Sequence, residues 1–422
     1  MQISSETKEL FQYPYIKRLY VARFISNYGN GLSQPALAFG ILHLKNGSAA
    51  ELGWVLATLN ISLIVMLPFG GVIADRFSQI KMVGLCDVLG SLGLFVQAGF
   101  FATGKVPFVL MLIVNGIFGV FWSIWWPAFV GVMPSLLPEK YLQKGNSINA
   151  LVSNISMILG AMSSGILLTL FGSAFPLALD AASFFISGLL MLTFSKAKIT
   201  KMVNQDSTSK ENINQPKLSF FAEMKSGWKV FLSFKWIVYV VFGFSAIMMA
   251  WAMSESVLGP LVFSKRAHGP LIWSSIILGS ETAGFLVGSI LAYHIKVKYT
   301  MRFLTLITFS LVAYIFSLHW PSWYYLIAIA AFAWGISADL WGSLWTTAMQ
   351  RTVPREHLSR ISSFDGMGTM LFRPLGLTLA APLTLVFGIS GTLNIAAFLV
   401  CAMIILILSS REVREMVMPR DD

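Results

Sequence analysis

Long stretches without charge constrain this chain more than any other feature. Residues 52–73 carry no charged side chain, and residues 82–103 carry only Asp87. Each stretch matches the ~20 residues that a helix needs to cross the ~30 Å hydrocarbon core of a bilayer. The whole chain is 12% charged, whereas soluble domains average about 25%. A soluble core cannot account for so much apolar sequence, so the chain is predicted to be a polytopic membrane protein.

An all-α membrane fold is expected, because lipid offers no hydrogen-bond partners to exposed backbone groups. Alternating strands of about ten residues, which a membrane barrel would require, are not seen. The apolar stretches of 18 or more residues predict twelve transmembrane helices, at 21–43, 52–73, 82–103, 107–133, 147–171, 175–195, 236–259, 271–293, 301–319, 322–348, 363–387 and 390–409.

The placement of Lys and Arg orients these spans. With the N-terminus inside, 25 of the 30 Lys and Arg residues fall in inside segments and 4 fall outside. The positive-inside rule therefore predicts that both termini are cytoplasmic. The chain divides into an N-terminal six-helix bundle, a cytoplasmic connecting loop and a C-terminal six-helix bundle, at 1–195, 196–235 and 236–422. Within the loop, apolar residues at helical spacing predict a surface helix over 219–234.

The two halves share an internal repeat at an offset of 216 residues. Span four to span five in the first half matches span ten to span eleven in the second half. The matching pairs include Gly119 with Gly335, Trp125 with Trp341, Gly160 with Gly376, and Gly172 with Gly388. Because each half has an even number of spans, the repeat is expected to be parallel, about an axis along the membrane normal.

A short polar hinge is expected between spans two and three. Gly70 and Gly71 would let two backbones approach closely, and Asp75, Arg76 and Lys81 would mark the cytoplasmic side. Three further motifs lie at the start of span one (23–27), after span four (137–143) and after span ten (354–361).

These motifs, the six-plus-six arrangement and the long central connection resemble the major facilitator superfamily along nearly the whole chain. Within it, the chain looks most like the branch of macrolide-efflux proteins and the enterobactin exporter. The resemblance implies two bundles that rock about a mid-membrane site by alternating access. It also implies a gate made by Gly71, Asp75, Arg76, Lys81 and Arg23, although Arg23 by position alone is expected to snorkel to the cytoplasmic interface.

The chain departs from the family pattern at several places. Ser78, Gln79 and Ile80 replace the Gly and basic residues that follow Asp-Arg. Span four has Asn115 near the depth of the family's buried Arg, and the antiporter motif of span five reads differently over 160–165. The last two departures weaken the case for proton antiport that the resemblance makes.

Ionisable side chains within spans are costly, so each is a functional candidate. Glu281 lies mid-span among small residues and would suit proton coupling, or it bonds across a helix interface. Asp339 lies among tryptophans, where it would suit a cationic ligand, or it pairs with Arg373. Glu255 lies near the outer end of span seven, where it would carry a role in transport or only face water.

Other polar residues are weaker candidates. Asp87 and Asp180 are expected to have local structural roles, and Asp365 is expected to stabilise a helix start. Uncharged polar and aromatic residues are expected to line a cavity, as a pocket for a bulky, partly apolar molecule requires. These cavity-lining candidates are Asn27, Gln34, Asn115, Trp122, Trp126, Asn154 and Trp341.

The sequence therefore predicts a secondary transporter of the bacterial inner (plasma) membrane, acting as a monomer. It would export a small amphipathic organic compound, such as a drug, macrolide or siderophore, with protons as the coupling ion. No enzyme activity, metal, cofactor or nucleic-acid partner is expected. The alternatives are import of a siderophore-like compound, lysolipid transport, or a membrane receptor or assembly factor that transports nothing.

Overall fold

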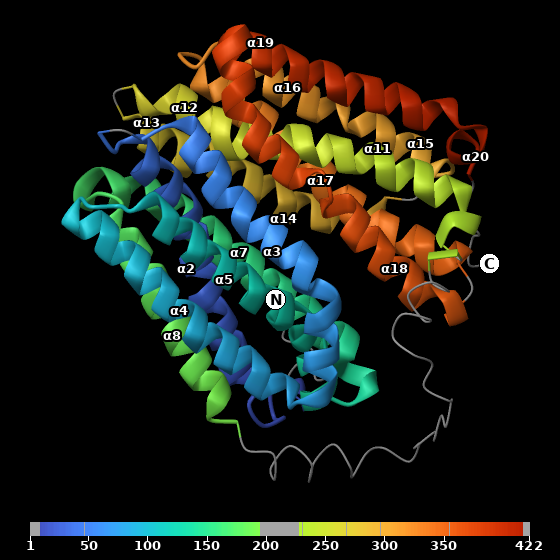
Figure 1. Ribbon diagram of the computed structural model, residues 1–422. Coiled ribbons are helices and arrows are strands. Elements are labelled where there is room, and N and C mark those ends of the chain that lie inside the picture. Colours follow the sequence, from blue (N-terminus) through green and yellow to red (C-terminus); the bar gives the residue numbers. More distant parts are fainter. Residues whose placement is uncertain are drawn as a thin grey trace. The chain divides into compact units, whose positions relative to one another are not determined.

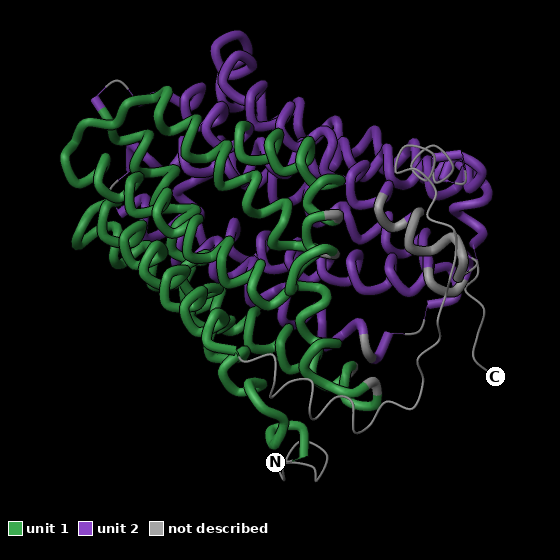
Figure 2. The backbone as a smooth tube through the Cα atoms, turned by 60° about the horizontal axis from the view of Figure 1, so that its bottom comes forward, with its two compact units in different colours: residues 1–44, 58–214 green, residues 45–57, 215–422 purple. Residues whose placement is uncertain are grey.

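The computed structural model is built from helices, and no strand occurs in the part that it describes (Figure 1). It describes residues 9–45, 47–194, 228–229, 231–266, 268–295, 297–353 and 355–416. Two compact units make up the chain, namely residues 1–44 with 58–214 (unit 1) and residues 45–57 with 215–422 (unit 2) (Figure 2). The predicted limit at 195 and most of the connecting loop lie outside the described part, so that division stays a prediction.

Unit 1 contains seven labelled helices, and the start of one of them, α3, falls in unit 2. Within the unit, α2 packs on α7 and α8, while α4 packs on α8 and α5. The bounds are α2 Ile16–Leu42, α3 Ala49–Arg76, α4 Gln79–Thr103, α5 Phe108–Val130, α6 Val132–Leu136, α7 Glu139–Phe171 and α8 Ala174–Leu192.

Unit 2 contains the remaining helices, including two π-helical stretches, η1 and η2. Here α11 packs on α19, α14 on α17, and α16 on both α17 and α19. The bounds are α11 Lys235–Ala252, η1 Met253–Leu258, α12 Gly259–Ser264, α13 Gly269–Leu271, η2 Ile272–Leu278, α14 Gly279–His294, α15 Thr300–Ile307, α16 Phe309–Ser317, α17 Tyr324–Thr352, α18 Arg355–Met370, α19 Arg373–Ser409 and α20 Arg411–Arg414.

Ten helical stretches of the described chain are long and apolar enough to cross a membrane. One of them, Phe364–Ser409, is interrupted by Gly388, where the backbone leaves the helical region. The 27-residue helix α2 is not among the ten. Counting α2 and both sides of Gly388 is consistent with the twelve predicted spans.

The helix breaks within the polar hinge expected over residues 70–81, but not at its two glycines. Gly70 and Gly71 are both inside α3, and the helical backbone stops only at Phe77 and Ser78 before α4 begins. A Cβ atom on Gly70 would lie 2.1 Å from the backbone oxygen of Ser123 in α5, whereas one on Gly71 would meet nothing within 4 Å. Close packing between helices therefore requires Gly70, and the chain turns without help from either glycine.

Paired glycines of the repeat make equivalent contacts in the two units. A Cβ atom on Gly119 would lie 2.3 Å from the Leu59 backbone oxygen, and one on Gly335 would lie 2.1 Å from the Glu281 backbone oxygen. Both contacts join span four to span two of their own half. Close backbone approach through small residues is how membrane helices pack when hydrophobic burial gives little drive.

The other two glycine pairs are also equivalent, one in its contacts and one in its backbone conformation. A Cβ atom on Gly160 would lie 2.3 Å from the Tyr28 backbone oxygen, and one on Gly376 would lie 2.2 Å from that of Met249. Gly172 and Gly388 both take a positive φ, at 73° and 69°, a conformation that side chains with a Cβ rarely adopt. The sequence repeat is therefore also a structural repeat.

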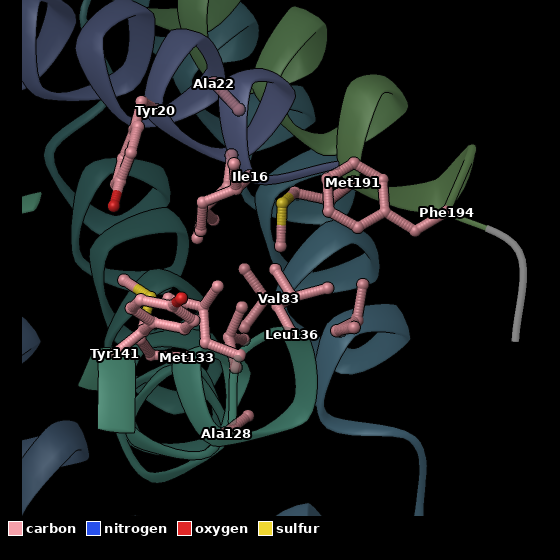
Figure 3. Close-up of a cluster of buried hydrophobic side chains, with 14 of the residues drawn as sticks. Ile16, Tyr20, Ala22, Val83, Ala128, Met133, Leu136, Tyr141, Met191 and Phe194 are labelled. Carbon is pink, nitrogen blue, oxygen red and sulfur yellow. The ribbon is translucent and has the colours of Figure 1, made fainter. Parts of the chain in front are cut away.

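An apolar cluster fills one end of unit 1 (Figure 3). It joins the first turns of α2, α4 and α7 to α6 and to the end of α8, and Tyr141 and Met133 lie on one side of it. The Tyr141 hydroxyl also donates a hydrogen bond to Glu9, and its ring meets the Tyr13 ring edge-on at 5.5 Å. The 137–143 motif thus anchors the segment that precedes α2.

Most of the predicted surface helix at 219–234 lies outside the described residues. Its described end carries Trp228, which stacks on Phe231 with 5.6 Å between ring centroids. Both rings also contact Phe364 of α18.

Two glycines of α17 offer a matched test of close helix packing. Gly335 faces the α14 backbone, whereas Gly342, two turns along, has open space around it. Gly335→Ala should destabilise the protein by about 1–3 kcal/mol, because the added methyl group forces α14 and α17 apart. Thermal unfolding of the purified protein in detergent measures the effect, with Gly342→Ala as the control. Equal melting temperatures for the two variants would contradict this packing.

Candidate functional site

Arg23 lies inside unit 1, with 8% of its surface exposed. Its guanidinium carbon lies 4.7 Å from the centroid of the Trp125 ring and 4.6 Å from that of Phe129, both in α5. The guanidinium also donates hydrogen bonds to Ser26 at 3.2 Å and to Asn27 at 2.9 Å. The expectation that Arg23 snorkels to the interface is therefore wrong, because aromatic faces and polar neighbours hold the charge inside.

Asp87 of α4 is the acid that faces this cation. It is 1% exposed and interacts electrostatically with Arg23. The Ser187 hydroxyl of α8 donates a hydrogen bond of 3.0 Å to Asp87 Oδ2. Asp87 Oδ1 has no hydrogen-bond partner, and the nearby Trp125 indole N–H does not reach hydrogen-bonding geometry. Four helices, α2, α4, α5 and α8, thus meet around one buried cation and one buried acid.

Sequence reasoning assigned Asp87 a local structural role and did not connect it with Arg23. The two residues are 64 positions apart and lie in different spans. The signal that could have joined them is charge balance, because a buried Arg requires a counter-charge and Asp87 is one of two acids in the N-terminal spans.

Glu281 is the buried acid of unit 2. It lies in the first turn of α14, is 3% exposed, and neither carboxyl oxygen has a hydrogen-bond partner. Its neighbours are the indole rings of Trp251 and Trp334, whose centroids lie 5.9 Å apart edge-to-face. Glu255 of η1 interacts with it electrostatically.

Glu255 and Arg373 belong to the same cluster as Glu281. Arg373 begins α19, and its guanidinium carbon lies 5.7 Å from the Trp251 ring centroid. Glu255 attracts Arg373, and Glu255 is half-buried, which corrects the interpretation that it only faces water. The fully buried Tyr314 completes the group, because it interacts with both glutamates and its hydroxyl has no hydrogen-bond partner.

Asp339 lies apart from this cluster. Its Cβ packs against Gly288, and its carboxyl group interacts with Ser289, both on α14. In the described part of the chain, Arg373 finds its counter-charge in Glu255, so the expected pairing of Asp339 with Arg373 is not present.

Both π-helical stretches border the acidic cluster. Glu255 lies within η1, and η2 ends three residues before Glu281. The ring of Trp273 in η2 packs directly on Gly259, the residue after η1, where a Cβ atom would lie 1.8 Å from the ring. π-helical segments frequently mark functional sites in helices, and here η1 carries Glu255 while η2 leads into the α-helical turn that carries Glu281.

The predicted gate residues are only partly described. Arg76 and Lys81 are exposed, and Gly71 is half-buried with open space above its Cα. The Asp75 side chain lies outside the described side chains. The gate therefore stays a prediction.

The predicted cavity-lining residues occupy different environments. Asn115 donates to the Met111 backbone oxygen at 2.8 Å, and Trp341 donates to Thr308 at 2.8 Å, so both side chains have internal partners. Asn27 belongs to the Arg23 cluster and donates to Ser153. Gln34 and Trp126 are exposed, and Trp122 and Asn154 are half-buried. Among the described residues, no group of three His, Cys, Asp or Glu side chains could hold a metal.

The Arg23–Asp87 pairing can be tested by charge removal. Arg23→Gln leaves Asp87 as an uncompensated buried acid and should destabilise the protein by about 3–5 kcal/mol. The double variant Arg23→Gln, Asp87→Asn should recover part of that loss, because neither charge remains. Thermal unfolding in detergent measures both variants, with the exposed Lys81→Gln as the control. Additive losses in the double variant would show that the two groups do not interact.

Solved structures of other proteins share this fold. The chain resembles a point mutant of the nucleoside transporter NupG with a TM-score of 0.73 at 16% identity, over 93% of this chain and 99% of that one. It resembles a bacterial homologue of the iron transporter ferroportin, in an inward-facing state, with a TM-score of 0.68 at 14% identity, over 93% and 98%. At these identities the likeness concerns the fold alone.

Sequence relatives cover most of both chains at 25% identity. They include the uncharacterised MFS-type transporter YkuC of Bacillus subtilis (88% of this chain, 86% of the relative). Others are the enterobactin exporter EntS of Salmonella paratyphi A (86% and 86%) and the macrolide efflux protein A of Streptococcus pyogenes (92% and 95%).

The family model described as "Major Facilitator Superfamily" matches residues 19–377, which is most of the chain. The helical fold, the repeated glycine contacts and the relatives agree with this match. The chain therefore belongs to the Major Facilitator Superfamily and is a multi-pass transporter of the bacterial inner membrane.

Proposed function

We propose that this transporter exports a small amphipathic organic compound in exchange for protons, by alternating access and without a chemical reaction on its substrate. Relatives that match over most of their length are named for export of enterobactin and efflux of macrolides. These names support export of a drug, macrolide or siderophore as the direction and substrate class.

The buried Glu281 carries the proposal. Its two carboxyl oxygens lie among tryptophan rings without a hydrogen-bond partner. An ionised carboxylate in such surroundings is costly, whereas a protonated carboxyl group is much less so. Such a carboxyl group is expected to bind a proton when it is buried and to release the proton when it is open to water. Coupling to a proton gradient requires this exchange.

Glu255 and Arg373 support this assignment through charge. Arg373 is attracted by Glu255 and lies over Trp251, so one glutamate of the cluster already has a counter-charge. Glu281 is then the acid of the cluster that a proton, rather than Arg373, would neutralise. Asp339, half-buried beside Ser289, is the second candidate for proton coupling.

The gate residues Gly71, Asp75, Arg76, Lys81 and Arg23 complete the proposal. In the Major Facilitator Superfamily, the hinge between spans two and three latches the two halves in one conformation. The exposed positions of Arg76 and Lys81 are compatible with contacts that form in only one state of the cycle. The buried Arg23 would act on the packing within unit 1.

Accumulation of fluorescent dyes and of macrolides in energised cells tests direction and coupling together. Wild type should lower accumulation, and a protonophore should abolish that effect. Glu281→Gln should reduce proton-driven export by about tenfold or more, because the neutral amide cannot exchange a proton. Proton flux in proteoliposomes, driven by the same compounds, should fall with it.

Glu412→Gln, at an exposed position of α20, is the matched control and should leave export unchanged. Asp339→Asn separates the two proton candidates. Export that survives in Glu281→Gln but not in Asp339→Asn moves the coupling role to Asp339. Raised accumulation in wild type would overturn export and favour uptake of a siderophore-like compound or a lysolipid.

A further inference from the structure

Trp125 and Asp87, the neighbours of Arg23 in unit 1, have no part in the proposed export mechanism. The polar groups of this cluster are incompletely satisfied in a buried environment. Arg23 Nε, Trp125 Nε1 and Asp87 Oδ1 all lack a hydrogen-bond partner. Buried polar groups in native proteins are nearly always bonded, so a gathering of such exceptions requires an explanation.

Arg23 does not depend on Asp87 alone to keep its charge. Its terminal nitrogens donate to Ser26 and Asn27, and its guanidinium carbon lies over two aromatic rings. Cation–π contacts of this kind are strongest where water is excluded from the cation and the ring. The cation therefore keeps several partners if Asp87 becomes neutral.

Asp87 has room for one proton. Ser187 donates to Oδ2, and this bond can remain while a proton from water forms an O–H bond at the unpartnered Oδ1. No existing hydrogen bond has to break.

The groups that face Asp87 come from each helix around it. Arg23 from α2 is the charged group, and Ser187 from α8 and Trp125 from α5 are neutral. Cys86 precedes it on α4 and interacts with it electrostatically. Asp180, the buried acid of α8, lies instead with Ser33 and Ser183. Arg23 is thus the single cation in this surrounding, among the described residues.

We propose that Asp87 is a second proton-binding site, in unit 1 and independent of Glu281, which couples protonation in α4 to the side-chain contact that Arg23 makes between α2 and α5. Proton binding removes the acid partner of Arg23 and leaves its cation held by Ser26, Asn27 and the α5 rings. The guanidinium is the link between α2 and α5, because its stacking on Trp125 and Phe129 bridges the two helices. A change at Asp87 therefore reaches this helix contact directly.

Trp125 is a built-in reporter for the site. Its ring face carries the guanidinium and its N–H edge lies near Asp87, so its fluorescence should respond when Asp87 gains a proton. The chain has 13 tryptophans, and subtracting the spectrum of Trp125→Phe isolates its signal. The purified protein in detergent should show a pH-dependent transition in this difference spectrum between about pH 5 and about pH 9, the range in which buried carboxyl groups titrate.

Asp87→Asn should abolish the transition, whereas Asp180→Asn, Cys86→Ser and Glu281→Gln should retain it. Retention in a folded Asp87→Asn protein would overturn the proposal. Loss in both Asp87→Asn and Asp180→Asn would also overturn it, because the signal would then report a global change.

Asp87→Glu covers the case in which Asp87→Asn does not fold. It keeps a carboxyl group but moves it by one methylene relative to Arg23 and Ser187, so the transition should persist with a shifted midpoint. An unchanged midpoint in Asp87→Glu would contradict the assignment to Asp87.

Discussion

Close approach of helix backbones at glycine is the constraint on which both units depend. In each unit, the same repeat glycines press span four against span two and span five against span one. Gly119 and Gly335 make the first contact, and Gly160 and Gly376 make the second. Because lipid is as apolar as the side chains, packing of this kind rather than hydrophobic burial holds membrane helices together. The two units therefore use two equivalent glycine positions each to bring the same pairs of helices together.

The sequence was sufficient for the fold class because its strongest signals are physical requirements of the bilayer. Uncharged stretches of sufficient length have to be spans, and the repeat identified corresponding helices before any contact was known. Local breaks were harder to predict. The Gly70-Gly71 pair suggested a hinge, yet α3 continues to Arg76, because glycine inside a membrane helix serves packing as readily as turning. The π-helical stretches of spans seven and eight left no recognisable pattern in the sequence.

The candidate sites were only partly predictable, since a buried charge depends on its partner. Glu281 stood out because it is an acid among small residues in mid-span. Its association with Glu255, Tyr314 and Arg373 brings together four helices, and no local pattern encodes that meeting. Arg23 was assigned to the interface because it lies near the start of a span. The tertiary fold overrides that position by placing two aromatic rings of α5 and the acid of α4 around it.

Unsatisfied polar groups show where this molecule departs from optimal packing. Among the described residues, most of the buried side-chain atoms without a partner gather at two places, around Arg23 in unit 1 and around Glu281 in unit 2. Elsewhere, many buried serines and threonines bond to the backbone of the preceding helical turn, as Ser156 and Thr305 do. A membrane interior penalises an unpaired polar group strongly. Such groups are therefore expected at places where a bound proton or ligand supplies the missing partner. Each unit thus combines a glycine-packed frame with one polar cluster in which several buried atoms lack a hydrogen-bond partner.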